Sequence, residues 1–474
     1  MFKLNRDILY LIFKELQDDE KSFFPCLLVN KTWSEIIIPI LWKNPWKYLK
    51  KGNEKLLSNV ILSHLSEESR NKLILNDHYN FLKNLNQKPL FDYINYCKHL
   101  HLNEIKRIIH VITDKKNEIQ IIGNEILKLF INENRVFTHL YIPYRFDYQI
   151  HLIPGANRCF SDLQFLRCHT IINDNILTGL TEICESIKEL ELFIGWSENN
   201  YGIIKLIENQ KKLFDIRLTY YYSRANESFF KILEISLIKH SNNVQYFKLT
   251  KQPITDILSS FVNLKRLELH DGFHYMPWNC LMNISLPFLQ VLKATGIPVK
   301  ALTSLIENTN GHLNEINIED AVYDDINNKI FIQAIYKNCP NLKYLKVLVK
   351  NNNILELEIL LIKCQYLNGL FLLFDSQKIS DSQKNSNDLF KILAKSSPTN
   401  LFKFKFWFNF NFKSDSLKLF FDNWKGRHPM LLQFPPNDYY DSYNLMEKYK
   451  AEGIIKRYDN ETYYEDFEWI EKKG

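Results

Sequence analysis

The chain has 474 residues, of which 46% are hydrophobic, with 60 Lys and Arg against 54 Asp and Glu. Its formal charge of +6 is small for this length and does not indicate a nucleic-acid-binding protein, which would carry a concentrated basic patch. Single cores stop growing near ~250–300 residues, so the length predicts either several domains or an elongated repeat protein.

The sequence also argues against membrane insertion and secretion. No run approaches the ~20 apolar residues of a membrane-spanning helix. Asp7, Lys14 and Glu15 interrupt the apolar stretch that a secretory signal would need near the N-terminus. The eight cysteines include no CxxC pair, which argues against a zinc site or a redox motif. We therefore expect a cytoplasmic or nuclear protein, without membrane contact, whose cysteines are reduced and buried.

The first 46 residues read as three short apolar helices. Residues 4–16 carry an apolar stripe at helical spacing, with Asn5 as the expected N-cap. We expect Ser22 to cap a second helix that includes residues 26–29, and a third helix around Trp33 that ends before Pro39. About forty residues cannot bury this much apolar surface alone, so the segment indicates a helical docking module.

This segment resembles an F-box, whose pattern is Leu-Pro-x-Glu-Ile-Leu-x-x-Ile-Phe-x-x-Leu followed by a Cys/Leu/Val helix and a Trp helix. Asp7 stands in place of the usual Glu and Asn5 in place of the usual Pro. The resemblance implies that the module docks an Skp-type adaptor and, through it, a cullin. The residues expected at the adaptor contact are Leu4, Ile8, Leu9, Ile12, Phe13, Leu16, Pro25, Cys26, Val29, Trp33, Leu41 and Trp42. The alternative is that these helices only cap a larger core.

Residues 47–90 are expected to form a helical linker or solenoid cap, and residues 91–435 a repeat. The repeated unit is apolar-x-x-apolar-x-apolar, with twelve copies that start at residues 97, 137, 163, 187, 213, 244, 264, 289, 313, 342, 367 and 401. A period near 25 residues with this hexamer is the signature of leucine-rich repeats. Four copies carry a cysteine three residues before an apolar position, as in the cysteine-containing repeats often found behind F-boxes: Cys97, Cys184, Cys339 and Cys364.

Each hexamer predicts a short strand whose two apolar residues point inward while the residue between them points outward. The following residues return the chain to the next strand, often as a helix, and neighbouring units stack to bury their apolar faces. The predicted fold class is therefore α/β: a three-helix N-terminal module followed by a curved leucine-rich-repeat solenoid with short parallel strands on its concave face.

The last segment, residues 436–474, is predicted to be a cap or tail after a proline-punctuated loop. Residues 443–451 are expected to form a helix, and residues 454–458 could form a last strand. Residues 437–474 hold 10 acidic against 6 basic side chains, together with several Tyr and one Trp. A solenoid needs caps at its ends. An acidic, aromatic interaction tail is the alternative.

The sequence contains no HExxH, GxxxxGK[ST], GxSxG or GxGxxG motif. His99, His101 and His110 could be drawn together as a metal cluster, but no carboxylate stands at a supporting spacing. We therefore expect no enzymatic activity, no metal and no cofactor.

The residues between the apolar hexamer positions should form the binding surface. They mix both charge signs with aromatic residues, which suits a protein or peptide ligand better than a nucleic acid. The residues expected to contact such a target are Arg167, Arg217, Tyr246, Arg266, His270, Tyr344, Phe371 and Trp407. Nucleic-acid binding through Lys403, Lys405 and Trp407 is a weaker alternative.

Together, the resemblance to an F-box and the repeat behind it imply a substrate-recognition subunit of an SCF-type ubiquitin ligase. In that interpretation the front module docks the Skp adaptor and the solenoid holds a target protein, with no bond chemistry in this chain. The alternative is a leucine-rich-repeat scaffold that binds a protein partner without any role in a ubiquitin ligase.

Overall fold

The computed structural model describes residues 4–74, 89–195, 199–220, 226–272, 276–320, 324–375, 382–408, 414–434 and 436–459. The chain divides into two compact units, residues 1–236 and 237–474. Among the described residues, five strands lie in the first unit and nine in the second, and within each unit neighbouring strands pair in parallel in chain order.

The first unit begins with helices and continues as alternating strands and helices. Its N-terminal helices are α1 (Arg6–Leu16), α2 (Glu20–Cys26), α3 (Lys31–Trp42), α4 (Glu54–Ser63) and α5 (Glu67–Ile74). The alternating part contains β1 (His99–His101), α6 (Leu102–Ile112), α7 (Lys116–Phe130), β2 (His139–Tyr141), α8 (Ala156–Phe160), β3 (Phe165–His169), α9 (Asp174–Ile183), β4 (Glu189–Ile194), α10 (Gly202–Glu208), β5 (Asp215–Tyr220) and α11 (Glu227–Ile238), which runs across the unit boundary.

The second unit repeats the same alternation to its last described strand. Its first half contains β6 (Tyr246–Leu249), α12 (Ile257–Ser260), β7 (Arg266–His270), β8 (Val291–Thr295), α13 (Val299–Glu307), β9 (Glu315–Glu319) and α14 (Asp325–Asn338). Its second half contains β10 (Tyr344–Lys350), α15 (Ile354–Lys363), β11 (Gly369–Asp375), α16 (Ser382–Ser396), β12 (Lys403–Phe408), α17 (Ser414–Asp422), β13 (Met430–Gln433), α18 (Pro436–Ala451) and β14 (Ile455–Asp459).

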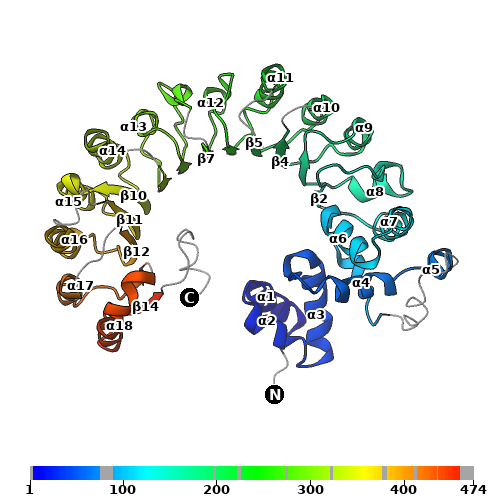
Figure 1. Ribbon diagram of the computed structural model, residues 1–474, viewed down its shortest axis with the longest axis horizontal. Helices are drawn as coiled ribbons and strands as arrows, with labels where there is room; N and C mark the ends of the chain where they lie inside the picture. The colour runs from blue at the N-terminus through cyan, green and yellow to red at the C-terminus, as the bar shows by residue number, and fades with distance from the viewer. Residues whose placement is uncertain are drawn as a thin grey trace. The chain divides into compact units, whose positions relative to one another are not determined.

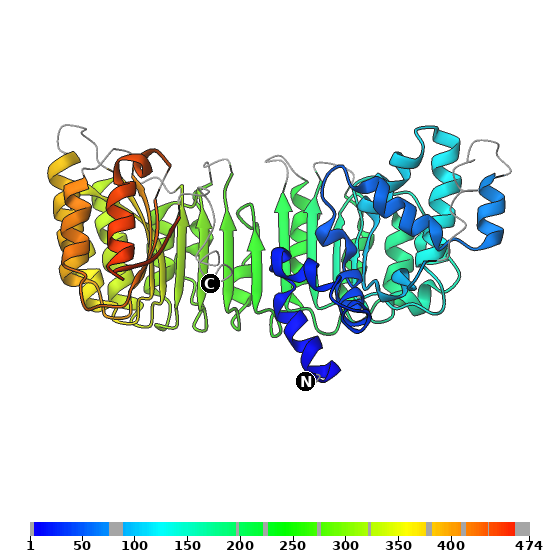
Figure 2. The same ribbon diagram turned by 90° about the horizontal axis from the view of Figure 1, so that it is seen from below.

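The described part of the chain also contains short 3-10 helices. They are η1 (Pro45–Tyr48), η3 (Tyr93–Tyr96), η4 (Ile150–Leu152), η5 (Asn279–Leu281) and η6 (Asn351–Asn353). Within each unit the strands line one side and the helices cover the other (Figure 1), and the strands run side by side (Figure 2). The side of the strands that faces away from the helices is called the strand face below.

The hexamer pattern predicted the core of both units. The apolar residues at its first, fourth and sixth positions are buried between strands and helices, for example Leu342, Leu345 and Val347, each 0% exposed. The strands start one residue earlier than the hexamer predicted, at its third position, as β3 does at Phe165. The α/β class and the repeated parallel strands are therefore confirmed.

The repeat continues beyond the predicted hexamers. Strand β13 at Met430–Gln433 pairs with β12, although the prolines around it suggested a loop. The predicted helix and final strand near residue 450 are confirmed as α18 and β14, and β14 pairs with β13. Strand pairing thus extends into the segment that was expected to be a cap, because backbone pairing with a neighbour does not require the full apolar pattern.

Two helix boundaries near the N-terminus differ from the prediction. Helix α2 begins at Glu20 because the Asp19 side chain accepts hydrogen bonds from the backbone N–H groups of Lys21 and Ser22, so Ser22 is not the cap. It ends at Cys26, and the next three residues form a turn. Helix α3 passes through Pro39 to Trp42, because its last turn is closed by a hydrogen bond from the Lys43 N–H to the Pro39 carbonyl.

Candidate protein-docking surfaces

Helix α1 has two apolar faces, one buried and the other exposed. One face carries Leu9 and Phe13, which are 6% and 1% exposed. The other carries Ile8, Leu11 and Ile12, which are 47%, 60% and 40% exposed. With 3.6 residues per turn, the mean directions of the two sets differ by about a third of a turn. A helix that is apolar on two sides can bury only one of them within so small a module, so the second remains available for a partner.

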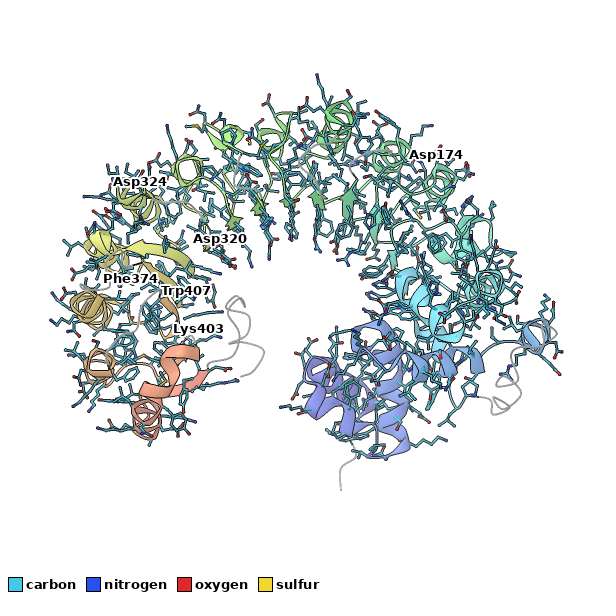
Figure 3. All side chains as sticks on the ribbon, viewed as in Figure 1. Asp174, Asp320, Asp324, Phe374, Lys403 and Trp407 are labelled. Atoms are coloured by element: carbon cyan, nitrogen blue, oxygen red, sulfur yellow. The ribbon has the colours of Figure 1, made fainter. Side chains whose placement is uncertain are left out.

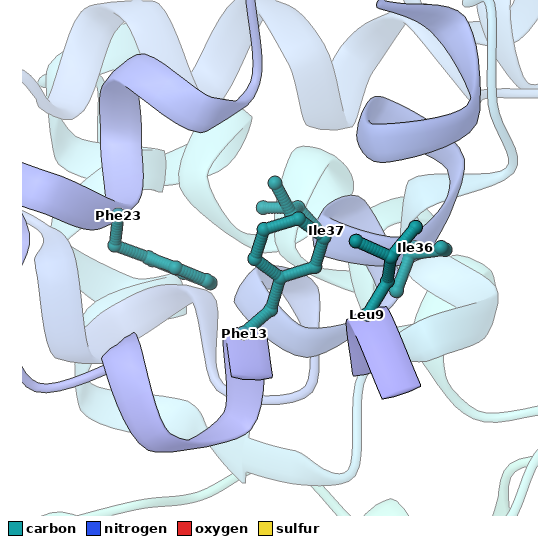
Figure 4. Close-up of a cluster of buried hydrophobic side chains, with 5 residues drawn as sticks. All are labelled: Leu9, Phe13, Phe23, Ile36 and Ile37. Atoms are coloured by element: carbon teal, nitrogen blue, oxygen red, sulfur yellow. The ribbon is translucent and has the colours of Figure 1, made fainter. Parts of the chain in front are cut away.

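The buried face of α1 builds the core of the N-terminal module (Figure 4). Leu9 and Phe13 join Phe23 of α2 and Ile36 and Ile37 of α3 in one cluster. The ring of Phe13 packs edge-on against the ring of Trp33, with 5.1 Å between the centroids. Residues that lie partly buried against this cluster are Leu16, Cys26, Leu27, Trp33, Ile40 and Leu41.

The structure separates the twelve residues expected at the adaptor contact into three groups. The exposed group is Leu4, Ile8, Ile12, Pro25 and Val29. The half-buried group is Leu16, Cys26, Trp33, Leu41 and Trp42. Leu9 and Phe13 are buried in the module core, so any contact of these two with an adaptor would be indirect. Sequence periodicity marked all of them as apolar but could not tell which face the rest of the module would cover.

Two exposed apolar residues beside the first group were not expected. Leu11 extends the exposed face of α1, and Leu28, in the turn after α2, is 89% exposed. We call the set Leu4, Ile8, Leu11, Ile12, Pro25, Leu28 and Val29 the apolar patch. The i, i+3 and i+4 spacing of Leu4, Ile8, Leu11 and Ile12 was the signal that could have added Leu11.

The N-terminal module is attached to the first repeat by its last residues. Trp46 is 7% exposed, and its indole N–H donates a hydrogen bond of 2.7 Å to the His99 carbonyl of β1. The Lys98 N–H donates to the Lys43 carbonyl at 2.9 Å. The ring of Trp42 packs on that of Tyr93 with 4.8 Å between centroids. Trp42 therefore helps to join the module to the repeat.

The strand face of the first unit carries a row of stacked rings. His99, His139 and Phe165 are in register on β1, β2 and β3. The rings of His99 and His139 stack with centroids 3.8 Å apart, and those of His139 and Phe165 stack at 5.4 Å. In the next row the rings of His101 and Tyr141 stack at 4.6 Å. We call the five residues of these two neighbouring rows the ring row: His99, His101, His139, Tyr141 and Phe165.

Burial keeps the histidines of the ring row neutral near pH 7. It lowers the pKa of His99 to about 3, with a further contribution from His139, and lowers the pKa of His101 and His139 to about 4. The positive charges of Lys43, near His99 and His139, and of Arg167, near His101, act in the same direction. The first two hexamers already contained these residues at their outward positions, so the outward rule applied to them would have found the ring row.

The ring row ends at an arginine that was expected to contact the target. The guanidinium of Arg167 on β3 lies 5.6 Å from the centroids of both Tyr141 and Phe193. It donates two hydrogen bonds, of 2.8 and 3.0 Å, to the carboxylate of Glu191 on β4. Arg217 on β5 pairs with Asp215 at 2.6 Å and lies 3.7 Å from Glu189. The two arginines expected at the target site thus stand within one network of charges across β3–β5.

In the second unit, three of the residues expected at the target site gather on β6 and β7. The guanidinium of Arg266 lies 5.1 Å from the centroid of Tyr246 and donates a hydrogen bond to Glu268 at 3.0 Å. Glu268 raises the pKa of Arg266 further, against the effect of burial. His270 ends β7 and is exposed.

The remaining three expected residues lie on β10–β12. Phe371 is only 3% exposed, because lysine side chains from both neighbouring strands lie over its ring. Tyr344 is half-buried and Trp407 is 38% exposed. In Figure 3, Lys403 and Trp407 lie on the strand face, whereas the buried Phe374 lies toward the helices. Phe371 was expected as a direct contact and instead forms the floor beneath two lysines.

The cysteines are built into the repeat. None of the eight forms a disulfide, and six are buried. Cys184, Cys339 and Cys364 follow directly after α9, α14 and α15. Burial raises the pKa of the Cys184 and Cys364 thiols to about 12, so they remain protonated thiols at neutral pH. Each contributes small apolar volume where a helix turns back to the next strand.

Neither a metal cluster nor a membrane-spanning helix is found in the part of the chain that the structure describes. Within it, no three His, Cys, Asp or Glu side chains are grouped so that they could hold a metal ion. No described helix combines the length and apolar character needed to cross a membrane. His99 and His101, once considered with His110 as metal ligands, are stacked on other rings of the ring row.

No family model matches this chain, and none of the curated proteins is similar to it.

Proposed function

We propose that this chain is a substrate receptor of an SCF-type ubiquitin ligase. In this proposal the N-terminal module is an F-box that docks an Skp-type adaptor and, through it, a cullin. The repeated units are leucine-rich repeats whose strand faces bind a target protein. The chain would act by tethering, because holding a target near the conjugating enzyme raises its local concentration. A receptor of this kind would work in the cytoplasm or nucleus.

The observation that carries the proposal is the two-faced helix α1. Its inner face closes the three-helix core through Leu9 and Phe13, while the apolar patch stays exposed on the same module. An exposed cluster of large aliphatic residues on a short module indicates a protein contact. A module that only capped the solenoid would be expected to turn its apolar faces toward the repeats.

The test is co-purification of the chain with an Skp-type adaptor after Ile12→Asp. A charge on the exposed apolar face of α1 should reduce the affinity at least tenfold, since apolar anchors of an interface contribute on the order of 2 kcal/mol or more. Tyr10→Asp is the matched control, because Tyr10 is 46% exposed on another side of α1. Circular dichroism should show both variants folded. Adaptor binding that is absent from the unaltered chain, or that survives Ile12→Asp undiminished, would contradict the proposal.

A repeat scaffold without a ligase role is the second candidate, and it is favoured only by the strand faces. Deleting residues 1–46 would not separate the two candidates, because it would remove the buried Trp46 and its hydrogen bond to β1. The point variants on α1 avoid this difficulty. A scaffold would keep its target binding and show no adaptor binding in any of the variants.

A further inference from the structure

Six neighbouring strands of the second unit place one residue each in a single row of the strand face. Strand pairing sets the residues of β9–β13 in register, and β14 follows through the pair Gln433 and Asp459. The row consists of Asn317, Lys346, Phe371, Lys405, Gln433 and Asp459, and we call it the lysine row. Lys346, Phe371 and Lys405 are each 3% exposed. Such burial of two lysine side chains in one row is unusual.

The cations of this region are held against aromatic rings. The ammonium nitrogens of Lys346 and Lys405 lie 4.4 and 4.7 Å from the centroid of the same ring, that of Phe371. Lys403, two residues before Lys405 on β12, is 7% exposed, and its ammonium lies 5.3 Å from the centroid of Tyr344. Lys346 also forms an ion pair with Glu319. Buried cations at this density favour an anionic ligand that also offers apolar groups.

The chain itself carries a segment with this chemistry directly after the row. Residues 460–474 contain five acidic and two basic side chains, together with Tyr463, Tyr464, Phe467 and Trp469. They follow Asp459, the last residue of β14 and a member of the lysine row. Strands are ~5 Å apart, so Lys346 lies ~20 Å across the sheet from Asp459, while fifteen extended residues reach up to ~50 Å.

We propose that residues 460–474 bind in cis to the lysine row and Lys403, with their carboxylates near the ammonium groups. The segment is tethered at the edge of the row, and a short tether gives a millimolar effective concentration, so modest contacts suffice to keep it bound. The proposal does not depend on the F-box assignment. If the strand face of β10–β12 also receives a target, that target must displace the segment and must carry similar acidic and aromatic groups.

Zero-length carbodiimide cross-linking of the full chain tests the proposal, with peptide mapping of the products. We expect cross-links from Lys403 or Lys405 to Glu461, Glu465, Asp466 or Glu468. The cross-link between Lys346 and Glu319 serves as an internal positive control, because that ion pair is already present. Absence of the expected cross-links while the control forms would overturn the proposal.

Two further arms identify the occupant. In the full chain, Glu465→Lys with Asp466→Lys should reduce the cross-links to the remaining carboxylates at least fivefold. The matched control Glu307→Lys with Asp388→Lys, placed on exposed parts of α13 and α16, should leave them unchanged. In a mixture of light and heavy isotope-labelled chains, each cross-link should join two peptides that carry the same isotope label. Mixed cross-links would assign the row to a second copy, and unchanged cross-links in the first variant would exclude charge pairing; either result overturns the proposal.

Discussion

The strand faces of β1–β3 and β9–β13 share one backbone arrangement and differ in chemistry. In the first unit the row is made of stacked, neutral rings, His99 on His139 on Phe165. In the second unit the next outward position of the hexamer, two residues later, carries lysines over a phenylalanine, Lys346 and Lys405 on Phe371. Both faces use rings as a floor, but only one adds a concentration of buried positive charge.

The difference shows how a repeat separates stability from recognition. Apolar residues at fixed hexamer positions are buried alike in both units, for example Leu166 and Leu345, each 0% exposed. The residues between them point to the strand face and are not required by the core, so they can vary from strand to strand. The same repeat can therefore present a neutral stacking surface in one unit and a cationic surface in the other.

The largest effect is expected where the two units are the same. Leu166→Ala and Leu345→Ala should each lower the free energy of unfolding by about 2–5 kcal/mol, because each leaves a cavity in a close-packed layer. Urea unfolding followed by circular dichroism measures the loss. Leu355→Ala is the control, since Leu355 is 67% exposed on α15 and should change stability by less than about 0.5 kcal/mol. A loss at Leu166 or Leu345 no greater than that of the control would show that the hexamers do not form a continuous core.

The ion pairs of the two faces should differ in their contribution to stability. Glu319→Gln removes the ion pair of Lys346, whose side chain is only 4% exposed. We therefore expect the free energy of unfolding to fall by about 3 kcal/mol. Glu191→Gln removes the ion pair of Arg167, whose side chain is 40% exposed. Here we expect the free energy of unfolding to fall by about 1 kcal/mol or less. Urea unfolding of the two variants at neutral pH makes the comparison. Equal losses would mean that burial does not distinguish the two faces.

The last effect is that of pH on stability, and it concerns the ring row. The pKa values of His99, His101 and His139 are lowered to about 3, 4 and 4, below the value of ~6.5 in an unfolded chain. Below pH 6.5 the unfolded state therefore binds protons that the folded state does not, and stability falls until the pH reaches the folded pKa values.

We expect a total loss of about 1–3 kcal/mol between pH 7 and pH 5, reduced from the full linkage value because the rings are only partly buried. The measurement is urea unfolding at the two pH values. The variant His99→Gln with His139→Gln should lose clearly less stability over this interval than the unaltered chain. The same loss in both proteins would show that these two rings are not responsible.

The strands and their buried residues could be predicted because the constraint is local. A short strand whose side chains alternate between two faces gives the same apolar pattern at every copy, and this pattern predicted β1 through β12. Strand β13 also has alternating buried apolar residues, Met430, Leu432 and Phe434, but the prolines on either side of it suggested a loop. Pro39 suggested the end of a helix, but the loss of one backbone donor was tolerated within α3.

The candidate docking surfaces were less predictable. All apolar residues of α1 look alike in sequence, and only packing against Phe23 and Ile37 shows that Leu9 is internal and Ile8 external. The sequence pattern predicts Phe371 as an exposed contact residue, and only the structure shows that Lys346 and Lys405 lie over its ring. These assignments depend on which residues of distant segments become neighbours.

The sequence by itself determined the repeat, the positions of most strands and the residues that fill the core, because a two-residue alternation and a period near 25 residues are local properties. The tertiary structure decided which side of α1 stays exposed, which rings stack in the ring row and which cations meet in the lysine row. The exposed side of α1 follows from its packing against α2 and α3. The two rows follow from strand register, which aligns residues that lie 25 or more positions apart in the chain.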